Sequence, residues 1–183
     1  MASRASQIKM ADKALFLDRD GIICKPLPRG EYLVRWDQFA FQDGIRDLAE
    51  FAKRKGYRVI VATNQSQVAR GLLSRGNLAD IHDKMSQGLP GLLDGVYYCP
   101  HADEDDCECR KPKPGLLARA ASDLGIDLTQ SFFVGDSFKD VNAGTAAGCI
   151  TIFLHNEYNR EEFEKCRPHY VVRNLGEVKK ILF

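Results

Sequence analysis

The stretch Ala14-Leu15-Phe16-Leu17-Asp18-Arg19-Asp20-Gly21 passes abruptly from four apolar residues to charged residues and a glycine. The apolar run is typical of a buried β-strand, and the polar residues after it indicate that the chain leaves the strand and enters a loop. Asp18 and Asp20 are one residue apart, so both carboxylates can face one pocket beyond the strand. Taken alone, the tetrapeptide Asp18-Arg19-Asp20-Gly21 is equally consistent with an ordinary polar turn.

The same pattern returns further along the chain. Residues 57–62 are β-branched and apolar and precede Thr63, and residues 131–134 precede Gly135-Asp136. In the segments between these runs, apolar residues recur at the spacing of an α-helix. We expect strands at 14–17, 57–62, 96–98, 131–134, 150–154 and 170–172, with helices at 43–55, 78–87, 114–124, 139–147 and 175–182. This alternation predicts an α/β fold with a doubly wound parallel sheet, whose strands have their ligand site at the carboxyl ends.

Length and composition limit the possible classes of protein. The chain has 183 residues, of which 44% are apolar, and 26 Lys and Arg balance 25 Asp and Glu. We expect an unstructured tail over residues 1–12 and one domain over residues 13–183. The net charge of +1 argues against a nucleic-acid partner. Mean hydropathy is −0.31, no apolar run is long enough to span a membrane and no leader is recognisable, so we expect a cytoplasmic protein without a membrane partner.

The acidic residues after the predicted strands indicate a divalent cation. Asp18, Asp20, Asp136 and Asp140 would repel one another strongly at one crevice without a positive charge between them. Mg²⁺ prefers such carboxylates and leaves coordination positions for phosphate oxygens. The hydroxyl of Thr63 and the charges of Arg110-Lys111 suit a bound phosphoryl group. Each of these short motifs is also common as a solvated loop, so their order along the chain is the stronger argument.

A second metal site is predicted by Cys99-Pro-His101 followed by Cys107-Glu-Cys109. Four such ligands form a closed tetrahedral Zn²⁺ site, which is structural rather than catalytic. Chance clustering of free cysteines is the alternative. We define residues 99–109 as the zinc loop, and expect it to fix Arg110 and Lys111, which follow directly. Cys24, Cys149 and Cys166 are interpreted as ordinary reduced cysteines.

Four segments, in order, resemble the motifs of the haloacid dehalogenase (HAD) phosphatases. They are Phe16-Leu-Asp18-Arg-Asp20-Gly21, Thr63-Asn-Gln-Ser66, Cys109-Arg110-Lys111-Pro112 and Gly135-Asp136-Ser-Phe-Lys-Asp140. The likeness covers about residues 14–154. It is greatest to the small branch that holds heptose bisphosphate and histidinol-phosphate phosphatases and that carries a similar Cys/His loop. The resemblance implies a HAD-like Rossmannoid sheet with a short flap, here residues 22–42, and no large cap domain.

The resemblance also implies roles for individual residues. Asp18 would be the nucleophile that forms an aspartyl-phosphate, and Asp20 the general acid and base. Thr63 and Lys111 would hold the phosphoryl oxygens. Mg²⁺ would be held by Asp18, Asp136 and the backbone carbonyl of Asp20. Asp140 would orient these ligands and the lysine without contacting the ion itself. Two residues depart from the usual pattern: Ile22, which mainly packs, and Ser137, where relatives often have Lys, so that Lys111 is expected to be the catalytic cation.

Substrate selectivity is expected from loops. The candidate substrate-binding residues are Tyr32, Asn64, Gln65, Ser66 and Arg110. The flap and the run after Asn64 favour removal of the 7-phosphate of D-glycero-D-manno-heptose 1,7-bisphosphate, whereas the short spacer in the zinc loop favours histidinol phosphate. A DNA 3′-phosphatase and a non-catalytic zinc-stabilised binding module are further alternatives. We expect a monomer that takes a small phosphorylated metabolite, and interpret His82 as a surface or packing residue.

Overall fold

The computed structural model describes residues 11–28 and 30–182 and has six parallel strands in one sheet at its centre, in the order β3-β2-β1-β4-β5-β6. From β1 the chain adds β2 and β3 toward one edge of the sheet, and it then adds β4, β5 and β6 toward the other edge. The prediction of a doubly wound parallel sheet is therefore confirmed. The strands are β1 Lys13–Leu17, β2 Tyr57–Asn64, β3 Gly95–Cys99, β4 Phe132–Gly135, β5 Ile150–Leu154 and β6 Tyr170–Val172.

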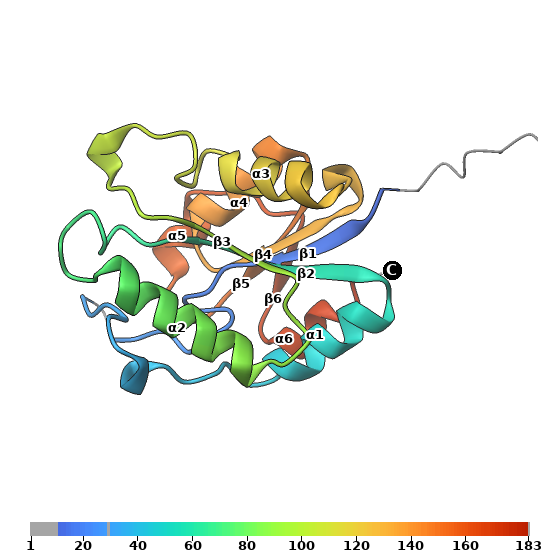
Figure 1. Cartoon of the computed structure of the whole chain (residues 1–183). Helices are drawn as coiled ribbons and strands as arrows, with labels where there is room; N and C mark the ends of the chain where they lie inside the picture. Colours follow the sequence, from blue (N-terminus) through green and yellow to red (C-terminus); the bar gives the residue numbers. More distant parts are fainter. Residues whose placement is uncertain (1–10, 29, 183) are drawn as a thin grey trace, which may run out of the picture.

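Helices cover both faces of the sheet (Figure 1): α3 and α4 lie on one face, and α1, α2 and α6 lie on the other. The winding changes direction between β1 and β4, and in open α/β sheets a ligand crevice forms at that point, beyond the carboxyl ends of the strands. The helices are α1 Ile45–Arg54, α2 Arg75–Gly88, α3 Gly115–Leu124, α4 Phe138–Ala147, α5 Arg160–Glu164 and α6 Leu175–Val178, with 3₁₀ turns at Trp36–Gln38, Asp103–Asp105 and Leu128–Gln130.

Strand β1 supplies both apolar cores because its side chains alternate between the two faces. Leu15 and Leu17 pack with α1 and α6, whereas Ala14 and Phe16 pack with α3 and α4. All four side chains are fully buried. Strand β1 is thus packed on both of its faces. Asp18 and Asp20 therefore follow a strand that is held rigidly in the core.

Several predicted boundaries were wrong for local reasons. Asp43 does not cap α1, because Gly44 occupies the N-cap in a left-handed conformation. Helix α2 begins three residues before the predicted start, since the Ser74 side chain accepts a hydrogen bond from the backbone N–H of Asn77. The final helix, α6, ends at Val178 instead of continuing to residue 182, and α5 was not predicted.

The flap is a mostly irregular loop that returns to its starting point. The backbone N–H of Lys25 donates to Ala40, and that of Gln42 donates to Ile23. Leu33 is buried against residues that include Leu78 of α2, so the flap packs on the body of the protein. This loop is far too short to form a large cap domain.

The predicted tail lies mainly outside the described residues, since residues 1–10 are not described. Asp12 differs from the prediction: its backbone hydrogen-bonds Gly125 and Asp127, and its carboxylate accepts from Arg58. Within the part of the chain that is described, no helix has the length and apolar character needed to cross a membrane.

Candidate active site

Three aspartates meet at the carboxyl ends of β1 and β4. Asp18 directly follows β1, Asp136 directly follows β4, and Asp140 lies in the first turn of α4. One carboxylate oxygen from each lies within 4.8 Å of the others. The sheet topology thus places Asp18 beside Asp136 and Asp140, which follow it by more than a hundred residues, as the sequence predicted.

Lys111 is the cation of this cluster. Its side chain is buried, and Nζ lies 2.5 Å from Asp140 Oδ1 and 3.0 Å from Asp18 Oδ1; it also donates to the backbone carbonyl of Ala62. Burial by itself would lower the pKa of Lys111, but the Asp140 and Asp18 carboxylates outweigh it and raise the pKa. Lys111 is therefore charged at neutral pH.

One lysine does not balance the carboxylates. Burial, with the neighbouring Asp140 and Asp20 carboxylates, raises the pKa of Asp18 to about 7, although Lys111 opposes the shift. Burial and the nearby Asp140 and Asp18 raise the pKa of Asp136 well above its ordinary value. Excess buried negative charge of this kind is what a divalent cation neutralises, so the donor set fits Mg²⁺.

Asp140 is better suited to orienting other groups than to holding a cation. Its Oδ1 accepts from Lys111, and its Oδ2 accepts from both the backbone N–H and the hydroxyl of Ser137. Ser137 also caps α4. Both carboxylate oxygens thus already accept hydrogen bonds, which favours an orienting role for Asp140 over binding a cation.

Asp20 has a different environment from the other acids. Arg19 donates to it from Nε and Nη2, Gln65 Nε2 donates at 3.0 Å, and Cys24 donates from Sγ. Burial alone would raise the pKa of Asp20, but the Arg19 guanidinium and these hydrogen bonds lower it. Asp20 is consequently ionised, while the side chain remains 44% exposed at the crevice.

Asn64, the last residue of β2, and Gln65, which follows it, both form side-chain hydrogen bonds inside the protein. Gln65 is fully buried, and Nε2 donates to Thr63 Oγ1 as well as to Asp20. Asn64 donates to the carbonyl of Lys111 and accepts from its N–H. Substrate contact by these two amides stays a prediction. In the structure Gln65 Nε2 holds Asp20 and Thr63, and Asn64 holds the Lys111 backbone, whereas Gln65 Oε1 is buried without a hydrogen-bond partner among the described residues. Ser66 is also buried.

Two other predicted substrate contacts lie further out. Tyr32 in the flap is 41% exposed, and its hydroxyl accepts from Arg70. Arg110 donates to Asp103 and to the carbonyl of His101, so its guanidinium is held by the zinc loop. Both side chains come from loops beyond the carboxyl ends of the strands.

The zinc loop converges on one point. Cys99 Sγ lies 3.5 Å from Cys107 Sγ, which lies 3.5 Å from Cys109 Sγ, and His101 Nδ1 lies 3.3 Å from Cys109 Sγ and 3.6 Å from Cys99 Sγ. Ligand atoms around a tetrahedral Zn²⁺ are about 3.5 to 3.8 Å apart. The four residues therefore fit a zinc ion. The remaining cysteines, Cys24, Cys149 and Cys166, are free and buried, as predicted.

Gly21 is required by the approach of Asp136. Its φ is +84°, and a Cβ at this position would lie 2.0 Å from Asp136 Oδ2. We expect Gly21→Ala to lose about 1–2 kcal/mol of stability from the left-handed backbone and, in addition, about tenfold or more in activity, because Asp136 must move. Gly56→Ala is the control, since Gly56 has φ +80° and no atom within 4 Å of the added methyl.

Denaturant unfolding and a phosphatase assay on both variants separate the two effects. The control should lose stability alone. Equal activities of the two variants would show that the contact with Asp136 is unimportant.

Arg19 and His82 were not recognised as site residues from the sequence. Arg19, which lies between Asp18 and Asp20 in the sequence, is buried, and its Nη1 lies 3.4 Å from His82 Nε2 on α2. Burial, and then the Arg19 charge, lower the pKa of His82 to about 4. The only hint in the sequence was an arginine between two acids, because the contact of α2 with the loop after β1 is a tertiary feature.

The low pKa of His82 predicts a dependence of stability on pH. Below pH 6.5 the unfolded chain binds a proton at His82 that the folded protein does not accept until about pH 4, so stability falls as pH falls through this window. Between pH 7 and pH 5 we expect wild type to lose about 2 kcal/mol relative to His82→Gln, which cannot titrate. Urea unfolding of both proteins at several pH values measures this difference, and parallel curves would contradict the prediction.

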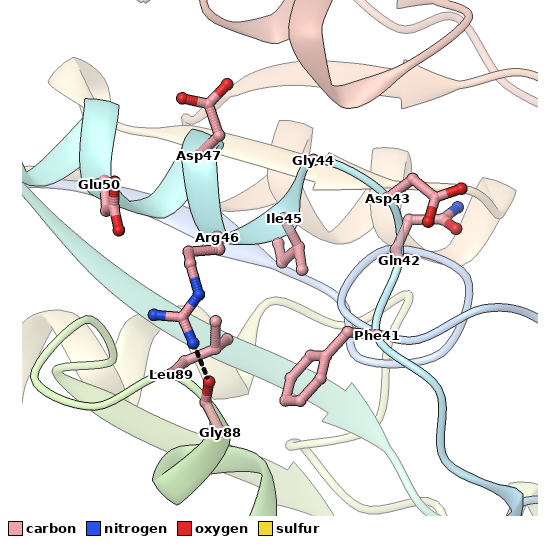
Figure 2. Close-up of a pocket in the computed structure, with 10 residues that line it drawn as sticks. All are labelled: Phe41, Gln42, Asp43, Gly44, Ile45, Arg46, Asp47, Glu50, Gly88 and Leu89. Carbon is pink, nitrogen blue, oxygen red and sulfur yellow. Dashed lines mark hydrogen bonds between the residues drawn. The ribbon is translucent and has the colours of Figure 1, made fainter.

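A surface cavity lies away from the aspartates, between the start of α1 and the end of α2. Its volume is about 440 Å³, and Figure 2 shows the residues that line it. Its lining includes the carboxylates of Asp43, Asp47 and Glu50, and contains no predicted site residue. Neither Lys111 nor any aspartate of the Asp18, Asp136 and Asp140 cluster lines this cavity, so the chemistry of the aspartate crevice is the better guide to the active site.

Comparison with known proteins identifies the family of this chain. A family model described as "HAD-hyrolase-like" matches residues 108–178. The D-glycero-beta-D-manno-heptose-1,7-bisphosphate 7-phosphatase of Pasteurella multocida is 37% identical, over 93% of this chain and 96% of that protein. The protein of the same name from Haemophilus influenzae is 42% identical, over 74% and 77% of the two chains.

A solved structure agrees with the sequence relatives. The D,D-heptose 1.7-bisphosphate phosphatase from B. bronchiseptica, complexed with magnesium and phosphate, superposes with a TM-score of 0.84 and 31% identity, covering 93% of this chain and 97% of that one. The chain therefore belongs to the HAD-like phosphatases, in the family of the heptose-1,7-bisphosphate 7-phosphatases.

Proposed function

We propose that the protein removes the 7-phosphate of D-glycero-D-manno-heptose 1,7-bisphosphate by Mg²⁺-dependent hydrolysis through an aspartyl-phosphate. The observation that carries the proposal is the cluster of Asp18, Asp136 and Lys111 at the point where the winding of the sheet reverses. The names of the relatives at 37% and 42% identity support the substrate.

In the proposed reaction Asp18 attacks phosphorus, and the bond between phosphorus and the sugar oxygen breaks. Asp20 gives a proton to the departing alkoxide and later takes one from the water that cleaves the aspartyl-phosphate, which releases inorganic phosphate. Lys111 and Thr63 hold the phosphoryl oxygens. A Mg²⁺ ion held by Asp18, Asp136 and the carbonyl of Asp20 would reduce the repulsion between the anionic nucleophile and the phosphate.

Both protonation states of Asp20 are accessible in this scheme. Arg19 keeps the carboxylate ionised in the protein without substrate, which suits the second step. A bound phosphate carries nearly two negative charges, and these raise the pKa of a neighbouring carboxyl group. Substrate binding therefore favours the protonated form that the first step needs.

We further propose that Zn²⁺ in the zinc loop has a structural role. The four side chains at tetrahedral spacing support this proposal. The ion would order a loop whose segment between His101 and Cys107 consists mainly of acidic residues. Substrate contact by Tyr32 and Arg110 is proposed on their place in loops around the crevice.

Histidinol phosphate is the second candidate substrate, favoured by the short spacer between His101 and Cys107. One experiment compares turnover of the heptose bisphosphate, histidinol phosphate and a 3′-phosphorylated oligonucleotide, with and without Mg²⁺. We expect kcat/KM for the heptose bisphosphate to exceed the others at least tenfold. A preference for histidinol phosphate would overturn the assigned substrate, and no turnover of any of them would overturn the enzymatic role. The single domain at 13–183, the monomeric state and the cytoplasmic location stay predictions.

A further inference from the structure

The guanidinium of Arg19 is buried directly behind the proposed acid-base group. Only 1% of the Arg19 side chain is exposed, and a buried charge is stable only when it is paired. Nε and Nη2 donate to Asp20 Oδ1 at 3.0 and 2.8 Å, and Nη2 also lies 2.9 Å from Oδ2. This forked contact sets the orientation of the carboxylate as well as its charge. Because Arg19 is buried, it does not itself meet the substrate.

The remaining arm of the guanidinium reaches α2. Arg19 Nη1 lies 3.4 Å from His82 Nε2, and the His82 ring packs against Tyr98, with ring centroids 5.4 Å apart. Arginine has no acceptor, so Nε2 must accept and the ring proton must be on Nδ1. His82 is neutral at physiological pH, which keeps this acceptor available.

We infer that Arg19 is a positioning residue for proton transfer by Asp20, and that His82 holds the outer end of its guanidinium so that the carboxylate stays aimed at the leaving oxygen. The inference rests on the proposed acid-base role of Asp20. It gives α2, which the reaction scheme does not otherwise use, a part in catalysis. Small displacements of a proton donor are costly to rate, so the pair should affect kcat more than substrate binding.

Two variants of His82 separate positioning from packing. His82→Gln keeps an acceptor near the place of Nε2, whereas His82→Leu removes the acceptor and leaves one Nη1–H unpaired. We expect His82→Leu to lower kcat on the heptose bisphosphate about 10- to 100-fold with KM changed less than twofold, and His82→Gln to restore most of the loss. Equal kcat values for wild type and His82→Leu would overturn the inference.

The leaving group provides the decisive readout. Nitrophenolate departs from p-nitrophenyl phosphate without needing a proton, so formation of the aspartyl-phosphate from this probe does not depend on the acid. In rapid-quench experiments with Mg²⁺, we expect His82→Leu to release the first equivalent of nitrophenolate at the wild-type rate but to be slow in the first turnover of the heptose bisphosphate. If both first turnovers slow equally, the pair has only a structural role and the inference fails.

Matched controls separate this inference from the proposed function. Met85→Ala truncates a fully buried side chain on the same helix, and should lower the melting temperature without changing the ratio of the two first-turnover rates. Asp20→Asn should show the leaving-group pattern strongly, and adding His82→Leu to it should cause little further loss, because both act on one step. If Asp20→Asn lacks the pattern, the proposed role of Asp20 fails; if it shows the pattern and His82→Leu does not, the inference alone fails.

Discussion

Asp18→Asn is expected to reduce turnover by at least about 10⁴-fold and to leave the fold intact. The amide has nearly the same shape as the carboxylate, but it cannot attack phosphorus to form the covalent intermediate. Asp18 is already directed toward the crevice, since its Oδ1 accepts from the backbone N–H of Arg19 at 2.7 Å and lies 3.0 Å from Lys111 Nζ. The loss should therefore be chemical and not structural.

The stability of this variant provides the control. Burial and the carboxylates of Asp140 and Asp20 raise the pKa of Asp18 to about 7, so the ionised group is not well stabilised in the protein without metal. Removing its charge should leave the melting temperature without Mg²⁺ unchanged or higher. Steady-state kinetics and thermal unfolding of the purified variant measure both effects, and turnover comparable to wild type would refute the aspartyl-phosphate mechanism.

Loss of zinc is expected to lower activity about 10- to 100-fold, although none of its four candidate ligands is proposed to contact the phosphate. Cys109 is directly followed by Arg110 and Lys111, so the ion would fix the start of the segment that presents both cations. Other side-chain interactions that hold the zinc loop include the ion pairs of Lys113 with Asp106 and Glu108. Such exposed ion pairs contribute little, roughly 1 kcal/mol or less each, whereas structural zinc contributes much more.

Cys107→Ser tests this coupling without a chelator, which would also remove Mg²⁺. We expect reduced zinc content by elemental analysis, a lower melting temperature and lower kcat in saturating Mg²⁺. Cys149→Ser is the control, because Cys149 is buried, free and outside the zinc loop. Full activity in a variant shown to be zinc-free would contradict the prediction.

The reactive groups could be predicted from the sequence because each lies next to a recognisable local signal. Asp18 and Asp136 directly follow short apolar strands, and parallel strands in a doubly wound sheet bring their carboxyl ends to one edge. The candidate zinc ligands are close in the chain, so their spacing alone indicates the site. These residues depend on local periodicity and on the general topology, both of which are visible without coordinates.

Helix boundaries were less predictable for a physical reason. Asp43 and Ser74 are both good N-cap residues, yet only Ser74 forms the cap. The residue at the start of α1 is set by how the returning flap enters the helix, with Gly44 in a left-handed conformation. That path depends on packing between segments distant in the chain.

The sequence by itself determined the α/β sheet, the order of the candidate catalytic segments and the two sets of candidate metal ligands. The tertiary structure alone decided which polar side chains near the crevice form hydrogen bonds inside the protein. Gln65 and Asn64 turn inward to hold Asp20 and Lys111, and Arg19 is buried between Asp20 and His82. The reason is that most buried polar groups form a hydrogen bond, and their partners come from helices and loops that only the folded chain brings together.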